Sequence, residues 1–161
     1  MAEHILIVYF TRSGNTKKIA SRIQHEIGGI MHEIHPEAPY PDSYNAVVDQ
    51  AKVEIHSGFK PALESTIKNV ETYDTIFVGS PNWWDTIAPP VATFLSTQDL
   101  SGKTIVPFCT HGGGGLGSIG VDIAKMCPRS TVQSCFEIYG SGGMDAGARV
   151  SAWLGRIEMK G

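Results

Sequence analysis

The chain has 161 residues, of which 42% are apolar, and a formal charge of −3. This length suits one well-packed domain over residues 1–161 and is too short for two domains of ordinary size. The mild charge, without a basic block or stripe, argues against nucleic acid as a partner. No apolar run approaches the roughly 20 residues that span a bilayer, and the first residues lack a signal-peptide pattern, so we expect a cytoplasmic protein that does not bind membranes.

Continuous apolar runs alternate with helical patterns along the chain. Strands are predicted at residues 5–10, 31–34, 75–78, 104–108 and 132–139, and helices at residues 17–27, 45–56, 90–96, 119–126 and 146–157. Because the strands are apolar throughout rather than alternating, they indicate a parallel sheet with helices on both faces. The sequence therefore predicts an α/β fold, a doubly wound three-layer sandwich with about five strands.

The first strand runs directly into a loop that is typical of a phosphate-binding site. Residues 11–16, Thr-Arg-Ser-Gly-Asn-Thr, follow the strand and precede the first helical pattern. Backbone N–H groups at the start of a helix, with the positive end of its dipole, favour a phosphate dianion. On this local pattern alone, an ordinary strand-to-helix turn with Asn15 or Thr16 as the N-cap fits as well.

The third strand is followed by an aromatic loop, Ser-Pro-Asn-Trp-Trp-Asp-Thr at residues 80–86. Two adjacent tryptophans cannot both enter one core while the chain stays extended. We therefore expect at least one of Trp83 and Trp84 to face a ligand or solvent. An aromatic plane at this place suits stacking on a flat heterocycle, worth about 0.5 to 1.5 kcal/mol beyond burial. The alternative is that both rings pack on the third helix as its lid.

The fourth strand is followed by a glycine-rich loop at residues 110–118. Its Gly112-x-Gly114-x-x-Gly117 pattern matches a dinucleotide fingerprint, with Glu137 downstream as a ribose partner. That fingerprint belongs after the first strand of such a domain, where a different loop stands here. Esterase, P-loop and cysteine-phosphatase patterns fail, because their G-x-S-x-G elbow, Gly-Lys-Ser/Thr sequence and downstream Arg are each missing.

The cysteines and histidines give no disulfide or metal-binding pattern. Cys109, Cys127 and Cys135 are odd in number and include no C-x-x-C pair, which favours buried free thiols. The histidines other than His111 have no metal-ligand spacing with cysteines or carboxylates. We therefore assign no metal ligand and no catalytic residue.

A phosphate-type loop after the first strand, an aromatic loop after the third and a glycine loop after the fourth together resemble the flavodoxin family, specifically its short-chain members. The similarity covers nearly the whole chain. It is carried by Thr11-x-Ser13-Gly14-Asn15-Thr16 and Ser80-Pro81-Asn82-Trp83-Trp84. The resemblance implies a sheet of order 2-1-3-4-5, one non-covalently bound FMN and low-potential electron transfer through that flavin.

By the same resemblance, one group of residues would hold the 5′-phosphate of FMN and two groups would flank its isoalloxazine ring. The phosphate group is Thr11, Arg12, Ser13, Gly14, Asn15 and Thr16, and the ring groups are Pro81, Asn82, Trp83, Trp84 and Asp85, and Thr110, His111, Gly112 and Gly113. Trp83 or Trp84 would supply the stacking face. Of the two, we expect Trp84 to contribute more to FMN affinity.

Three departures from the family pattern bear on the role of this chain. Asp85 stands where related loops often have Gly, and a backbone flip that needs positive φ costs Asp of order 1 kcal/mol more than Gly. The charge of −3 provides little steering toward a basic redox partner, and the glycine loop lacks the Tyr that commonly covers the outer flavin face.

These observations leave three hypotheses. The favoured one is an FMN electron carrier whose partners are a reductase and an acceptor protein. The second is an FMN-dependent NAD(P)H:quinone-type oxidoreductase, with a small quinone or nicotinamide as its substrate. The third is a dinucleotide-binding module that holds no flavin.

Overall fold

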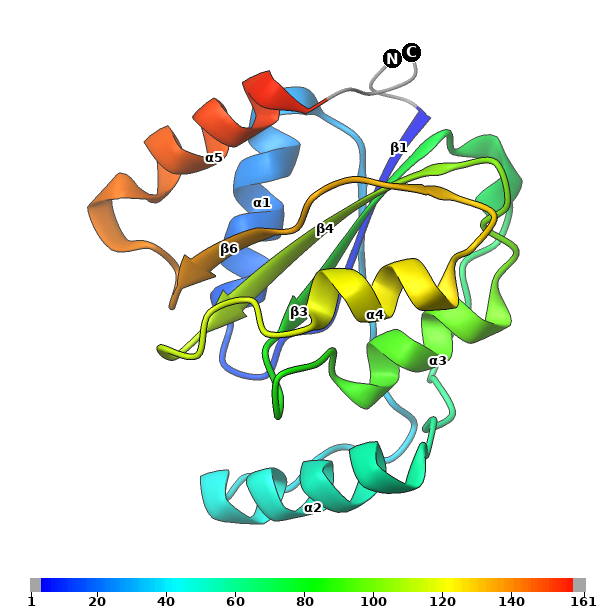
Figure 1. Cartoon of the computed structure of the whole chain (residues 1–161), viewed down its shortest axis with the longest axis vertical. Coiled ribbons are helices and arrows are strands. Elements are labelled where there is room, and N and C mark those ends of the chain that lie inside the picture. Colours follow the sequence, from blue (N-terminus) through cyan, green and yellow to red (C-terminus); the bar gives the residue numbers. More distant parts are fainter. Residues whose placement is uncertain (1–3, 158–161) are drawn as a thin grey trace.

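The computed structural model describes residues 4–157 as one sheet with helices on both faces (Figure 1). The strand order is β2-β1-β3-β4-β5, with β6 also pairing with β4. All of these pairs are parallel. The predicted doubly wound fold with order 2-1-3-4-5 is confirmed, whereas the predicted domain limits at residues 1 and 161 lie outside the described residues.

The elements follow one another as predicted, with changes at their ends. The strands are β1 (Ile5–Tyr9), β2 (Ile30–Glu33), β3 (Thr75–Pro81), β4 (Thr104–His111), β5 (Thr131–Val132) and β6 (Phe136–Tyr139). The helices are α1 (Asn15–Ile27), α2 (Tyr44–Ser57), α3 (Pro89–Thr97), α4 (Ile119–Met126) and α5 (Ala146–Arg156), with short 3-10 helices at Val70–Thr72 and Gly143–Asp145. None of the described helices is long and apolar enough to cross a membrane.

Two clusters of buried apolar side chains lie on the two faces of the sheet. One joins strand residues such as Ile7 and Phe77 to α1 and α5. The other joins alternate strand residues such as Leu6 and Ile76 to α3 and α4. Side chains of a strand point alternately to its two faces, so strands that are apolar throughout serve both clusters. This arrangement is the three-layer sandwich.

The predicted fifth strand is split into β5 and β6, and Pro107 in β4 gives a physical reason. The N–H of Thr104 donates to the carbonyl of Asp74, just before β3, and the carbonyl of Ile105 accepts the N–H of Gln133 on the fifth-strand side. The backbone hydrogen-bonding groups of successive residues point alternately to the two neighbouring strands. The backbone of Pro107 therefore faces the fifth strand. Proline has no N–H to donate there. The pairing stops at Ile105 and resumes at Phe108.

The strands that frame the functional loops are longer than predicted. Strand β3 continues to Pro81 and β4 to His111, where the sequence pattern ends them at residues 78 and 108. Helix α2 begins at Tyr44 after Ser43, whose side chain accepts the N–H of Ala46 as an N-cap (3.4 Å). Helix α2 contacts α3 and stands apart from the sheet in Figure 1.

Candidate functional site

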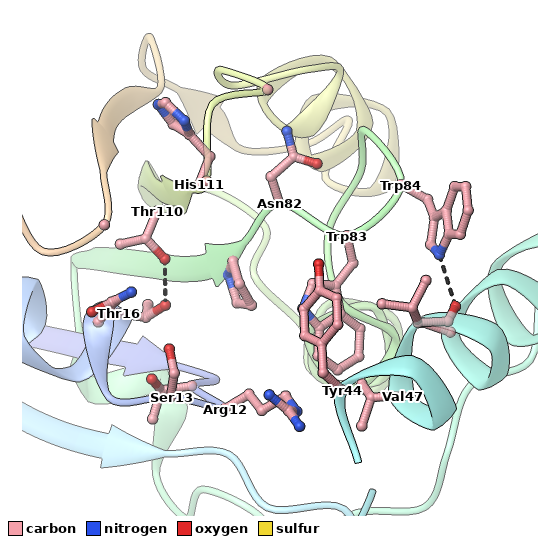
Figure 2. Close-up of a pocket in the computed structure, with 18 of the residues that line it drawn as sticks. Arg12, Ser13, Thr16, Tyr44, Val47, Asn82, Trp83, Trp84, Thr110 and His111 are labelled. Carbon is pink, nitrogen blue, oxygen red and sulfur yellow. Dashed lines mark hydrogen bonds between the residues drawn. The ribbon is translucent and has the colours of Figure 1, made fainter. Parts of the chain in front are cut away.

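A pocket of about 710 Å³ lies at the carboxyl ends of β1, β3 and β4 (Figure 2). The strand order reverses between β1 and β3, and ligands of doubly wound sheets bind at such a switch point. The volume is within the range of roughly 300 to 1,000 Å³ that cofactor sites occupy. Every predicted site residue except Gly14 and Gly113 lines this pocket. The structure thus brings the three predicted loops together.

The lining also includes residues that the motifs did not indicate. These are Tyr44, Val47, Val48, Ala51, Gly114, Tyr139 and Gly140. Two of them are tyrosines, Tyr44 of α2 and Tyr139 at the end of β6. The glycine loop itself contains no tyrosine.

The loop at residues 11–16 presents backbone donors at the start of α1. Its N-cap is Gly14, at φ 97°, and not Asn15 or Thr16. The N–H of Gly14 donates to Thr11 Oγ1 (3.0 Å) within the loop. No hydrogen bond of the described chain uses the N–H of Ser13, Asn15 or Thr16. These N–H groups, at the positive end of the dipole of α1, fit an anion.

Thr16 and Thr110 tie this loop to β4. Their hydroxyl oxygens lie 2.8 Å apart, and the two residues are only 1% and 3% exposed. One hydroxyl must donate to the other, so a single O–H hydrogen of the pair remains for a ligand. The hydroxyl of Thr16, expected to hold a phosphate, first fixes the start of α1 against the end of β4.

The aromatic loop forms a tight two-residue hairpin. The N–H groups of Trp83 and Thr86 each donate to the carbonyl oxygen of the other (3.0 and 3.1 Å). The two central residues, Trp84 and Asp85, have φ of 55° and 67°. Positive φ at both central residues is the geometry of a type I′ turn, which normally selects Asn-Gly or Gly-Gly. The positive φ considered for a flip at Asp85 is therefore already present.

Neighbouring loops hold this strained turn in place. The N–H of Asp85 donates to Asn82 Oδ1 (2.8 Å), and its carbonyl accepts from the N–H and Oγ of Ser118, both at 2.7 Å. A Cβ at Gly117 would lie 2.6 Å from that carbonyl oxygen. The aromatic and glycine loops therefore touch so closely that only glycine fits at residue 117.

The two tryptophans face different surroundings. Trp83 packs on the core, edge-on to Phe10 and Tyr40 at ring-centre distances of 5.3 and 5.0 Å. Trp84 is 47% exposed, and its Nε1 donates to the carbonyl of Val48 (3.0 Å). The expectation that at least one ring faces ligand or solvent is confirmed. Figure 2 shows Trp83 at the centre of the pocket and Trp84 at its edge beside α2.

His111 holds the start of the glycine loop. Its Nδ1 accepts the N–H of Gly113 (3.0 Å), and its Nε2 lies 2.5 Å from Glu137 Oε1. A ring nitrogen that accepts an N–H carries no proton, so the neutral ring donates from Nε2 to the carboxylate. Glu137, considered above as a ribose partner for a dinucleotide, is thus engaged by His111.

The pocket carries few charges. Among its lining residues, Arg12 is the only permanent cation and Asp85 the only carboxylate. Arg12 Nη2 donates to the carbonyl of Asp42 (2.9 Å), and the guanidinium lies 5.9 Å from the centre of the Tyr44 ring.

Burial, with Glu137 adding to it, raises the pKa of the Cys109 thiol beneath the pocket to about 12. That thiol stays protonated near neutral pH and is a poor nucleophile. Within residues 4–157, no group of three or more His, Cys, Asp or Glu side chains is placed to hold a metal ion.

These features define the class: a doubly wound α/β protein with a cofactor-sized pocket between a helix N-terminus and aromatic side chains. The family model described as Flavodoxin matches residues 4–155. The chain belongs to the flavodoxin family. No curated protein matches the chain.

Solved structures agree with this assignment. A candidate flavoprotein of Bacteroides eggerthii is 32% identical, with 97% of this chain and 98% of that chain covered and a TM-score of 0.85. A flavoprotein of Lactobacillus acidophilus, solved in complex with FMN, is 24% identical, with 91% and 99% covered and a TM-score of 0.74. Flavodoxin 2 of Bacillus cereus is 20% identical, with 92% and 93% covered and a TM-score of 0.59. The last two show the shared fold.

Proposed function

We propose that this chain binds one FMN non-covalently and serves as a low-potential electron carrier between a reductase and an acceptor protein. The observation that carries the proposal is one pocket with unpaired N–H donors at the start of α1 and aromatic side chains beyond them. The FMN complex of the Lactobacillus acidophilus protein, which has the same fold, supports the choice of ligand.

The donor set fits FMN at both ends of the pocket. The N–H groups of Ser13, Asn15 and Thr16 are unpaired within the described chain and would hold the phosphate. The ring would lie between the aromatic turn and residues 110–113, which come from neighbouring strands, β3 and β4. In Figure 2, Ser13 and Thr16 lie at one side of the pocket and Trp83 lies beyond Thr110 and Asn82.

When bound, FMN supplies a ring that accepts and donates one or two electrons. The residues of this chain set how favourable an added electron is. Trp83 and Pro81 line one side of the pocket with apolar groups. The charge of Arg12, the one permanent cation of the lining, is matched by the carboxylate of Asp85, and the phosphate of a bound FMN would add further negative charge. Extra negative charge in this pocket is therefore poorly compensated, which favours a low reduction potential.

An FMN-dependent oxidoreductase is the second candidate, because one specific observation favours it. Helix α2 turns an apolar face, Tyr44, Val47, Val48 and Ala51, toward the pocket. A protein that only exchanges electrons at an exposed ring edge does not need such a face.

Reconstitution tests these proposals. The purified chain is mixed with excess FMN, the excess is removed, and the visible spectrum is recorded, followed by assays with NADH and NADPH without other proteins. The carrier is supported by bound FMN, an EPR-detectable radical during slow photoreduction and no steady-state turnover. Turnover of NADH or NADPH with a small acceptor instead establishes the oxidoreductase. Absence of bound flavin overturns both and leaves the dinucleotide-binding module.

A further inference from the structure

His111, the last residue of β4, is anchored to β6 by both its backbone and its ring. It pairs in register with Tyr139, and its carbonyl accepts the N–H of Gly140 (2.8 Å). The imidazole stands edge-on to the Tyr139 ring at a centre distance of 6.0 Å, and the side chain is only 9% exposed. Figure 2 shows it at the side of the pocket where β4 ends. The fold therefore sets where the ring nitrogens of His111 lie.

The segment that follows, residues 112–114, consists of three glycines, whose backbone has the widest range of conformations. Within the described chain this segment makes one hydrogen bond, from the N–H of Gly113 to His111 Nδ1 (3.0 Å). Gly113 is at φ 120°, and Gly112 and Gly114 line the pocket. A single imidazole nitrogen therefore selects the shape of this part of the pocket.

Glu137 decides which nitrogen of His111 is left to accept. Its Oε1 lies 2.5 Å from Nε2, and because an ionised carboxylate can only accept, Nε2 carries the hydrogen and Nδ1 carries none. Arg149 Nη2 of α5 donates to the carbonyl of Glu137 (3.0 Å), which steadies the backbone of that residue. Glu137 thus orients His111, and His111 in turn holds Gly113.

Nδ1 cannot hold a proton and accept the N–H of Gly113 at the same time. A proton there keeps the bond from Nε2 to Glu137 but sets two N–H groups against each other, which releases residues 112–114. Histidine is the side chain whose charge ordinarily changes between pH 5 and 8. We propose that His111, oriented by Glu137, is a positioning residue for the ring side of the FMN site, and that binding of the flavin ring is linked to loss of a proton from Nδ1. The proposal rests on the proposed FMN site.

The charged and titratable groups around His111 determine the sign of this linkage. They are Glu137 and Tyr139 of β6, Arg149 of α5, Cys109 of β4 and, elsewhere on the pocket lining, Asp85 and Arg12. The adjacent carboxylate of Glu137 favours a protonated ring when the glycine segment is loose. A bound flavin ring needs the segment in place, so it disfavours that proton. Affinity for the ring should therefore fall as pH falls.

Riboflavin titrations at pH 8.0 and pH 5.5 test this linkage, because riboflavin has the ring of FMN without the phosphate, whose own charge changes in this range. Flavin fluorescence gives the Kd. For the unmodified chain we expect the Kd to rise at least about threefold at the lower pH. His111→Leu removes the acceptor and should raise the Kd at pH 8.0 by about 3- to 10-fold.

His111→Asn separates positioning by an acceptor from a merely structural role. Its side-chain oxygen lies near the place of Nδ1 and does not titrate. We expect this variant to bind riboflavin within about threefold of the unmodified chain at pH 8.0, with the same Kd at both pH values. His25→Asn is the matched control, since His25 is exposed on α1 and does not line the pocket. It should keep the pH dependence of the unmodified chain.

A second readout needs no flavin. In ¹H–¹⁵N spectra of the flavin-free chain, the Gly113 cross-peak should shift between pH 8.0 and 5.5 in the unmodified chain and in His25→Asn, and stay in place in His111→Asn. A Kd that is independent of pH in the unmodified chain, or an equal pH dependence in His111→Asn, overturns the linkage. Failure of both FMN and riboflavin to bind at pH 8.0 overturns the proposed function, whereas the Gly113 cross-peak still reports whether Nδ1 holds the glycine segment.

Discussion

The replacement Ser13→Ala separates recognition of a phosphate from recognition of the flavin ring. The Ser13 hydroxyl makes no hydrogen bond within the described chain, and the residue is exposed. Its removal therefore leaves the fold intact. A hydrogen bond to a charged group is worth about 1.5 to 3 kcal/mol, which corresponds to a Kd for FMN about 10- to 150-fold higher. Riboflavin has the same ring without the phosphate, so its Kd should change by less than about twofold.

Quenching of flavin fluorescence on binding measures both constants at fixed ionic strength. Ser21→Ala, an exposed position on the same helix, is the matched control and should change neither constant. Urea unfolding should give free energies within about 0.5 kcal/mol of the unmodified chain for both variants. An equal loss of FMN and riboflavin affinity, or no loss of either, would show that the Ser13 hydroxyl does not bind the phosphate.

Three further predictions concern stability. Thr16→Val or Thr110→Val leaves one buried hydroxyl unpaired and should cost about 1 to 3 kcal/mol in urea unfolding, while the double variant should cost less than the sum; additive costs contradict a paired role. Gly117→Ala should lose about 1 to 2 kcal/mol from its left-handed backbone and about 1 to 3 more from overlap with the aromatic turn. Its control Gly115→Ala, also at positive φ but with open space around its Cβ, should lose only the first amount, and equal losses would refute the clash. Burial raises the pKa of Cys109 from an ordinary 9.0 to about 12, so the unfolded chain releases this proton first and stability falls as pH rises from 9 toward 12. In Cys109→Ala that fall should be shallower by up to about 1.4 kcal/mol per pH unit, and parallel curves would remove the thiol as the cause.

Most of the fold could be predicted because strands buried on both faces leave a continuous apolar signature. The order of β1, β3 and β4 follows from the family resemblance. The break between β5 and β6 was missed, because its cause lies in another strand. Pro107 removes a donor from β4 on the fifth-strand side, and nothing in residues 132–139 themselves records that loss. Strand ends were also misjudged where polar residues such as Ser80 and Thr110 continue the sheet.

The site could be predicted where a motif signals its own chemistry, as the loops after β1, β3 and β4 do. The part of the pocket lining that comes from α2 could not be predicted, because an i, i+3, i+4, i+7 pattern of apolar residues looks the same whether it faces a core or a cavity. Only the position of the helix decides between them. Tyr139 was missed for a similar reason, since a Tyr at the end of a strand carries no sign of which loop it will approach. His111 and Glu137 are 26 residues apart in the sequence, and their side chains are in contact in the structure.

The turn at Trp84 and Asp85 shows why the conformational free-energy cost of single residues is a poor guide to the backbone shape of such a site. Read alone, two bulky or charged residues at positive φ conflict with the turn they occupy, and such conflicts concentrate at functional sites. The compensation comes from the glycine loop, where Ser118 donates twice to the Asp85 carbonyl and Gly117 makes room for it. Neither loop has its observed shape without the other. Because both loops border the pocket, a change that relaxes either one should alter the space available to a bound ring, even when the altered residue never touches it.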